Sequence, residues 1–551
     1  MSPPLSRPFT AETARDRTQG IGRQILLRVA LAVLGGFMLC VPWLNTQLFW
    51  LGWVAWLPLL VALRGTGPRQ AFLLGWLAGA VCFAGGSYWL AGFMVNLKQV
   101  SPLLSVLLAA LFWCYLGIAI GLVCMLYRWL VYRLGGWELL VFPLCVVAVM
   151  ALYPMLFKTH FADGQIDFLP ALQAIELTGA AGLDGVMALF AVLLYRLLAK
   201  REMRSGRPSV IAHRVAWVLV LAWLGYGLVT LQSWDQRMQQ WEPRRIGLVQ
   251  PNDPITLGVP EPAPGFSREF PAEMAATQRL IEAGAQWVAW PEARYKGYFD
   301  SYSVRQRYAR EVAQSGVPLI FHDVEREWLD ADRVSFNTVA LLDGQGALAA
   351  RYRKMLRMPF GEYLPVPWSW PLMSKINDQV FGEFLRPLGA GTEHTEFVID
   401  HMRVMPMVCY EAAFADFVAG AVSNDGAGKV LLFLSQDNWF GESAQPLQHA
   451  NMSILRGVEN RLPMVHLINN GPSVVTAPNG RVLARSSSFN HDELLVRMPF
   501  DPTAGGSVFS RYPGLFLNTV YCVLGALVVF ALWRGRPGRA QRDQPDSPSD
   551  H

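Results

Sequence analysis

One cysteine of this sequence stands apart from the others. Cys409 closes the apolar run Val404–Val408 and is the only cysteine between Trp234 and Gly514, whereas the other six fall inside strongly hydrophobic segments. This distribution excludes a disulfide within the polar stretch and leaves one thiol where chemistry can occur. A single cysteine at the end of a strand is more often a small buried hydrophobe than a nucleophile. The rest of the sequence must therefore decide its role.

Two further predicted strand ends carry the groups that a nucleophilic thiol needs. Glu292 follows Trp290-Pro291, and Lys354 follows Tyr352-Arg353. A thiol is largely protonated near neutral pH, so it requires a base to take its proton or a cation to stabilise the thiolate. Glu292 can be that base, and Lys354 can stabilise both the thiolate and the oxyanion of an acyl transfer. Each residue also has a plainer explanation, as a helix cap or a solvated charge, and only their combination indicates covalent catalysis.

The composition indicates a membrane protein with a large polar part. The 551 residues are 52% hydrophobic and include 20 Trp, yet 16% are charged. That is too apolar for an ordinary soluble protein and too charged for a purely intramembrane one. Windows of about 20 residues predict eight spans. They cover residues 23–43, 48–63, 71–95, 103–127, 137–157, 177–198, 215–233 and 515–533.

Lysine and arginine placement predicts the orientation. Positive charge gathers in the N-terminal tail, in every second loop (64–69, 128–133 and 200–214) and in the C-terminal tail. Since short cytoplasmic loops accumulate such charge, both termini are expected in the cytoplasm and residues 234–514 outside it. The expected layout is a cytoplasmic tail (1–22), seven helices (23–233), a polar domain (234–514), a final helix (515–533) and a disordered tail (534–551). The net charge of +5 reflects these loops and indicates no nucleic-acid partner.

The polar domain alternates short apolar runs with helical stretches. Strands are expected at 245–249, 286–290, 317–321, 338–342, 347–352, 404–409, 430–434 and 465–468, and helices at 271–283, 303–315 and 448–460. Several of these runs are continuously apolar, as in strands covered on both faces. Residues 343–346 read as a hairpin turn. The fold class is therefore a multi-span α-helical membrane protein with an inserted α/β sandwich.

Three motifs resemble the Glu-Lys-Cys triad of the carbon-nitrogen hydrolase (nitrilase) superfamily. They are Trp290-Pro291-Glu292, Lys354 with Pro359-Phe360-Gly361-Glu362, and Cys409-Tyr410-Glu411. With many spans before the domain and one after it, the whole chain resembles the apolipoprotein N-acyltransferase family of the bacterial inner membrane. The resemblance implies that Glu292 is the general base, Lys354 the oxyanion stabiliser and Cys409 the nucleophile. Glu362, Tyr410 and Glu411 match positions that support the triad.

The chain also departs from that family at two places. It has Ser435-Gln436-Asp437 where the family usually has Ser-Asn-Asp before Trp-Phe-Gly. The stretch 153–165 keeps Gln165 but lacks the Gly-Tyr-Ser that usually precedes it. A divergent N-acyltransferase with another acceptor therefore remains an alternative to the usual one.

The resemblance implies a reaction in two steps with two lipid partners. A phospholipid would donate its acyl chain to Cys409, and the amine of a diacylglyceryl apolipoprotein would accept it, in the periplasm and without a cofactor. No metal is expected, because His322, His449 and His466 show no ligand spacing. The aromatic segment 363–388 can be a lid at the membrane interface or a packed structural loop. Other readings are a membrane-tethered amidase, a binding module with a vestigial triad and, ranked low, a transporter using Glu176 and Asp184.

Overall fold

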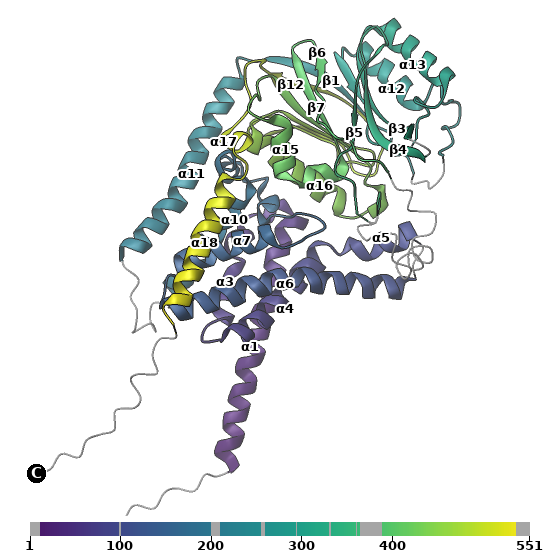
Figure 1. Ribbon diagram of the computed structural model, residues 1–551. Helices are drawn as coiled ribbons and strands as arrows, with labels where there is room; N and C mark the ends of the chain where they lie inside the picture. Colours follow the sequence, from purple (N-terminus) through teal and green to yellow (C-terminus); the bar gives the residue numbers. More distant parts are fainter. Residues whose placement is uncertain are drawn as a thin grey trace, which may run out of the picture.

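The structure is a computed structural model that describes residues 11–98, 101–199, 210–254, 259–293, 295–329, 332–359, 361–363 and 388–535. A domain of two sheets sits at one end of a set of long helices (Figure 1). The expected lid, 363–388, lies outside these ranges except for its first and last residues. Most of the expected disordered tail, 534–551, also lies outside them.

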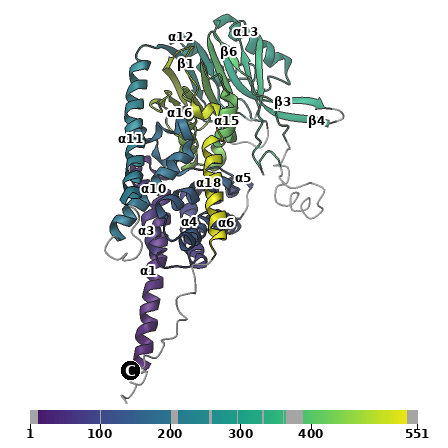
Figure 2. The same ribbon diagram turned by 60° about the vertical axis from the view of Figure 1, so that its left-hand side comes forward.

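Helices form the part that precedes the polar domain, and one more helix follows it. They are α1 (Ala11–Leu44), α2 (Trp50–Val54), α3 (Trp56–Ala62), α4 (Pro68–Gly86), α5 (Trp89–Lys98), α6 (Pro102–Leu134), α7 (Glu138–Leu152), α8 (Leu169–Leu172), α9 (Ile175–Thr178), α10 (Ala180–Ala199), α11 (Val210–Met238) and α18 (Leu515–Trp533). The short 3-10 helix η2 (Phe161–Gln165) lies in the connection after α7. In both views α1 extends past its neighbours (Figures 1 and 2).

The structure does not confirm eight spans. Within the described residues, five helices are long and apolar enough to cross a membrane, and the pair α4 and α5, bent by 54°, makes a sixth if it is one span. The predicted spans at 48–63 and 137–157 correspond to shorter apolar helices, 46–62 and 138–152. At the rise of an α-helix the 15 residues of α7 reach about 22 Å. The hydrocarbon core of a bilayer is about 30 Å thick. Helix α7 is therefore too short to cross it, although its composition is apolar.

The polar domain is built on two six-stranded sheets. The first has the order β12-β1-β2-β3-β4-β5 and the second β11-β10-β9-β8-β7-β6. The first comprises β1 (Glu242–Gln250), β2 (Trp287–Ala289), β3 (Leu319–Leu329), β4 (Asp332–Leu342), β5 (Leu348–Arg353) and β12 (Asp492–Phe500). The second comprises β6 (Phe397–Ile399), β7 (Met402–Val408), β8 (Lys429–Ser435), β9 (Met464–Ile468), β10 (Val474–Thr476) and β11 (Val482–Arg485). In Figure 2 the hairpin of β3 and β4 projects beyond the other strands.

The two sheets pack face to face with helices outside them. Side chains of both sheets share one core, for example Leu248 and Val339 with Val408 and Leu432. Helices α12 (Ala272–Glu282) and α13 (Tyr302–Ser315) cover the first sheet, while α15 (Ala415–Val422) and α16 (Gln445–Asn460) lie on the side of the second sheet that faces the membrane helices. Every residue of β8 is buried, which explains its continuous apolar run. The expected α/β sandwich is confirmed.

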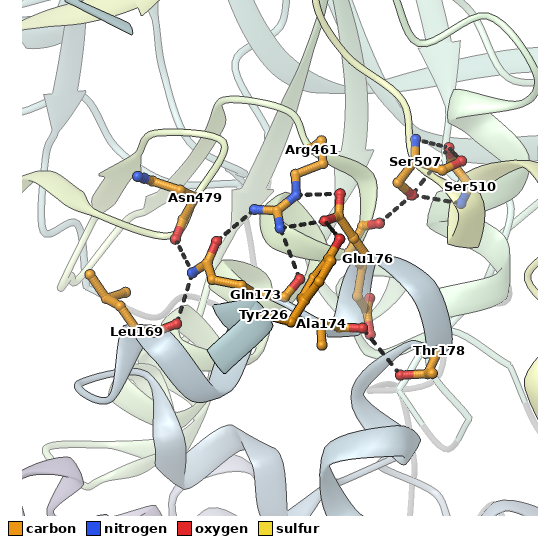
Figure 3. A network of polar contacts seen from close by, with 11 residues as sticks. Leu169, Gln173, Ala174, Glu176, Thr178, Tyr226, Arg461, Asn479, Ser507 and Ser510 are labelled. Carbon is orange, nitrogen blue, oxygen red and sulfur yellow. Dashed lines mark hydrogen bonds and ion pairs between the residues drawn. The ribbon is translucent and has the colours of Figure 1, made fainter. Parts of the chain in front are cut away.

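A buried arginine fixes the domain to the helical part (Figure 3). Arg461 ends α16 in the left-handed conformation, with φ of 53°, and its side chain is 1% exposed. Its guanidinium donates to the side-chain and backbone oxygens of Gln173 at 2.7 and 2.8 Å and pairs with Glu176 at 2.7 Å. Tyr226 of α11 donates to the same carboxylate. The end of α16 is thus held between α8 and α9.

Asp184, the second carboxylate noted in the sequence, also has hydrogen-bond partners within the fold. Asp184 accepts hydrogen bonds from the backbone N–H of Ala162 and from the His160 ring, both at 2.8 Å. These bonds secure the connection that contains η2. Glu176 and Asp184 therefore have structural partners, which weakens the transporter reading.

Candidate active site

The turn that carries Cys409 is strained and held by a buried carboxylate. Cys409 directly follows β7 with φ of 49°, a left-handed conformation that is unfavourable for any residue but glycine. One oxygen of Glu411 accepts the N–H of Val408 at 2.7 Å. The other accepts the Tyr352 hydroxyl and the N–H groups of Met355 and Leu356 at 2.7 to 3.0 Å. Glu411 is fully buried, so it joins the cysteine turn to the end of β5, where Lys354 lies.

Lys354 provides a permanent positive charge in the site. Its side chain is buried, and the ammonium donates to Glu362 at 3.0 Å. The other oxygen of Glu362 accepts the N–H of Met358 at 2.7 Å. Burial lowers the pKa of Lys354, but the carboxylates of Glu362 and Glu292 outweigh it and hold this pKa above its ordinary value. The ammonium is therefore available to stabilise a negative charge.

Glu292 and Cys409 have pKa values suited to exchanging a proton. Burial raises the pKa of Glu292 to about 7, against the opposing charge of Lys354. Burial and the nearby Glu292 carboxylate also raise the pKa of the Cys409 thiol, which therefore rests protonated. One oxygen of Glu292 accepts the N–H of Gln436 at 3.1 Å, which fixes the carboxylate. A base with a pKa near neutrality can accept a proton and return it.

An aspartate and a histidine that sequence reasoning had not connected with the thiol lie beside it. The ligand atoms of Cys409, Asp437 and His449 lie within 4.8 Å of one another, a spacing that can hold a metal ion. However, His449 Nδ1 faces the Asp437 carboxylate at 2.8 Å and Nε2 faces the backbone carbonyl of Cys409 at 3.1 Å. Both partners are acceptors, so the ring donates from both nitrogens and offers no lone pair to a metal.

The same contacts favour a charged imidazole. Burial lowers the pKa of His449, but the Asp437 carboxylate outweighs it and the net effect raises this pKa. The imidazole supports the backbone of the strained Cys409 turn. The sequence gives His449 no role in metal binding and does not connect it with Cys409. The one local signal for its pairing with Asp437 is their separation of twelve residues.

The candidate residues line a cavity of about 360 Å³ that reaches the membrane helices. Glu292, Lys354, Glu362, Cys409 and Tyr410 all lie on its wall, and Glu411 lies behind it. The remaining wall is rich in apolar side chains from both parts of the chain: Trp89, Leu90, Phe93, Phe112, Leu116, Phe157 and Phe440.

Two contacts join the turn that carries Cys409, and the segment of Phe440, to the helical part. The Phe93 and Phe440 rings stack at 4.9 Å, and the Tyr410 hydroxyl donates to the backbone carbonyl of Leu156. An acyl chain can therefore lie with its hydrocarbon part against the apolar wall and its carbonyl carbon near the Cys409 thiol.

Two families of known proteins match different parts of the chain. Residues 245–500 match the carbon-nitrogen hydrolase family, and residues 35–193 match the apolipoprotein N-acyltransferase N-terminal domain. The apolipoprotein N-acyltransferase of Geobacter metallireducens is 28% identical over 520 residues, which are 91% of this chain and 94% of the relative. That of Gloeobacter violaceus is 28% identical over 542 residues, 95% and 98% of the two chains. A solved amidase of the nitrilase superfamily from Nesterenkonia is 19% identical over 47% of this chain and 92% of its own, with a TM-score of 0.34.

Proposed function

Since the chain belongs to the apolipoprotein N-acyltransferase family, we propose that it transfers an acyl chain from a membrane phospholipid to the N-terminal amine of a diacylglyceryl-cysteine apolipoprotein through a thioester on Cys409. One observation carries the proposal: the three predicted catalytic side chains line a single cavity whose remaining wall is rich in apolar side chains, many of them from the membrane helices. A hydrolase of soluble amides has no need of such a wall, whereas an enzyme with lipid substrates does.

In the first half-reaction the thiol becomes acylated. Glu292 takes the proton of Cys409, and the sulfur attacks the ester carbonyl of the phospholipid. The Lys354 ammonium stabilises the negative charge on the carbonyl oxygen. When the intermediate collapses, the carbon–oxygen bond breaks and Glu292 returns the proton to the departing alkoxide. The products are a thioester enzyme and a lysophospholipid.

In the second half-reaction the uncharged amine of the apolipoprotein attacks the thioester. Glu292 takes the proton that the amine loses as the amide forms, and then gives it to the departing Cys409 thiolate. The pKa of about 7 at Glu292 suits both directions of transfer. The apolar wall favours this amine over water, since it retains lipid-anchored molecules near the thiol.

Mass measurement of the purified full-length enzyme tests the thioester. Incubation with phospholipid alone should add one acyl chain to the protein and release about one lysophospholipid per enzyme. Cys409→Ala should remove both signals and all turnover, while the matched change Cys522→Ala at an exposed cysteine of α18 should leave them unaltered. An active Cys409→Ala enzyme would exclude the mechanism.

Adding an acceptor distinguishes the remaining activities. A diacylglyceryl lipopeptide with a free N-terminus should discharge the thioester and start turnover. Steady release of free fatty acid without an acceptor would instead indicate the membrane-tethered hydrolase. Use of another amine, with the lipopeptide ignored, would indicate the divergent N-acyltransferase.

We also propose the expected location, with residues 234–514 in the periplasm, anchored in the inner membrane by 23–233 and 515–533. The alternation of positively charged loops supports this orientation. A phosphatase fused after Gly480 should be active, and one fused after Arg539 should be inactive. The reverse pattern would refute the orientation.

A further inference from the structure

The segment that follows β8 contacts the proposed base directly and the proposed nucleophile through one histidine. The backbone N–H of Gln436 donates to the Glu292 carboxylate at 3.1 Å. The next residue, Asp437, is fully buried, and its carboxylate faces Nδ1 of His449 at 2.8 Å. From α16, His449 donates through Nε2 to the carbonyl oxygen of Cys409 at 3.1 Å. Two adjacent residues thus connect with both groups that exchange a proton.

His449 holds the backbone on one side of the Cys409 side chain. The oxygen that it contacts belongs to the peptide bond that follows Cys409. On the other side, Glu411 accepts the N–H of Val408 at 2.7 Å. With φ of 49°, Cys409 has a conformation that persists in a residue other than glycine only where the surroundings hold it. A single rotatable bond separates this backbone from the sulfur, so the orientation of the peptide decides where the thiol lies.

The His449 ring is itself fixed in place. It forms a T-shaped contact with the His466 ring of β9, with centroids 4.6 Å apart and planes at 87°. The two ring nitrogens of His466 contact the hydroxyl oxygens of Ser435 and Ser453 at 2.7 and 2.8 Å. Ser453 also donates to the backbone carbonyl of His449 at 3.1 Å. The end of β8, strand β9 and helix α16 therefore hold the imidazole in one orientation.

These contacts give His449 a positioning role rather than the role of a base. Each ring nitrogen faces an acceptor, so both donate and neither has a lone pair with which to take the thiol proton. The Asp437 carboxylate compensates the charge of such a ring. One ligand atom from each of Cys409, Asp437 and His449 lies within 4.8 Å of the other two. The pair therefore stands beside the reacting sulfur without taking part in the proton transfer.

We propose that the pair of Asp437 and His449 positions the Cys409 thiol against its base. The inference rests on the proposed function in so far as Cys409 is the nucleophile and Glu292 the base. The link to Glu292 uses the backbone N–H of Gln436, so it does not depend on the side chain at that position. Loss of the bond to the Cys409 carbonyl should slow acylation without weakening donor binding, because the apolar side chains that bind the acyl chain are unchanged.

Two substitutions at one position separate the two bonds of the ring. The amide nitrogen of His449→Gln can take the place of Nε2 and donate to the Cys409 carbonyl. The amide nitrogen of His449→Asn, one methylene shorter, takes the place of Nδ1 and contacts Asp437, but does not reach Cys409. Both replacements are neutral and polar, so a general effect of losing the buried histidine is common to them. The control His491→Asn removes an exposed histidine that pairs with Glu493.

Acylation of the purified full-length protein is followed by mass measurement at increasing donor concentrations. One donor is a phospholipid and the other is p-nitrophenyl acetate, a small soluble ester, while Cys409→Ala gives the blank for other thiols. With both donors the maximal rate of His449→Asn should fall about 10- to 100-fold, and the half-saturating concentration of phospholipid should be unchanged. His449→Gln should restore most of the rate, and His491→Asn should behave as the wild type.

Equal maximal rates for His449→Asn and the wild type would overturn the proposal, as would a His449→Gln enzyme that is as slow as His449→Asn. A raised half-saturating concentration at an unchanged maximal rate would also overturn it and would assign His449 to donor binding. Because p-nitrophenyl acetate acylates a thiol without any lipid, failure of phospholipid as the donor would refute the proposed function and leave this test readable. A wild-type protein that neither ester acylates would overturn both.

Discussion

The raised pKa of Glu292 predicts that replacing the proposed base slows acylation and makes the protein more stable at high pH than at low pH, relative to the wild type. Burial raises this pKa from 4.5 to about 7, so the folded protein binds the proton more tightly than the unfolded chain does. The stability that results is fully present below pH 4.5 and is lost as the pH rises through 7. Glu292→Gln keeps an oxygen for the N–H of Gln436 and carries no charge that burial would penalise.

The magnitude follows from the two pKa values. Each pH unit between 4.5 and about 7 corresponds to about 1.4 kcal/mol. The free energy of unfolding of Glu292→Gln, minus that of the wild type, should therefore be about 3 kcal/mol larger above pH 7 than below pH 4.5. Thermal midpoints followed by tryptophan fluorescence across this range measure the effect. Glu261→Gln, at an exposed glutamate, should follow the wild type at every pH.

The same group should control the rate of thioester formation. Glu292 must be ionised to take the thiol proton, so acylation of Cys409 should fall as the pH decreases through about 7. Glu292→Gln should lower the acylation rate at least 10²-fold. A rate that stays constant from pH 5 to pH 8, or a substituted enzyme that loses stability at high pH, would refute the assignment of Glu292 as a buried base.

Two further substitutions test the supports of the site. Glu411→Gln should cost about 1–3 kcal/mol of stability. The amide has only one oxygen, so its NH₂ group would face the Val408 N–H or the side chain would lose its other hydrogen bonds. An unchanged thermal midpoint would contradict the four bonds at Glu411. Arg461→Met should cost about 3 kcal/mol or more by leaving the Glu176 carboxylate without its cation. Arg481→Met, which breaks a pair whose arginine is 48% exposed, should cost less than about 1 kcal/mol, and equal losses would refute the role of burial.

Some strands of the polar domain show in the local sequence pattern, and others do not. The continuous apolar runs of β7, β8 and β9 reveal their burial directly, because each strand is covered on both faces. The sequence did not reveal β12, an antiparallel neighbour of β1 whose residues 492–495 include no buried side chain. This strand forms by pairing with β1, about 250 residues earlier in the chain. A local sequence pattern cannot predict such a distant pairing.

The sequence by itself determined which residues could do the chemistry. Glu292, Lys354 and Cys409 each follow a predicted strand and carry a recognisable motif, since residue type and strand periodicity are local properties. Only the tertiary structure decided that they share one cavity with apolar side chains of the membrane helices. It also set the pKa of Glu292 and placed His449 against the backbone of Cys409. Burial and nearby charges depend on segments distant in sequence, so only the folded chain fixes the pKa values of these side chains.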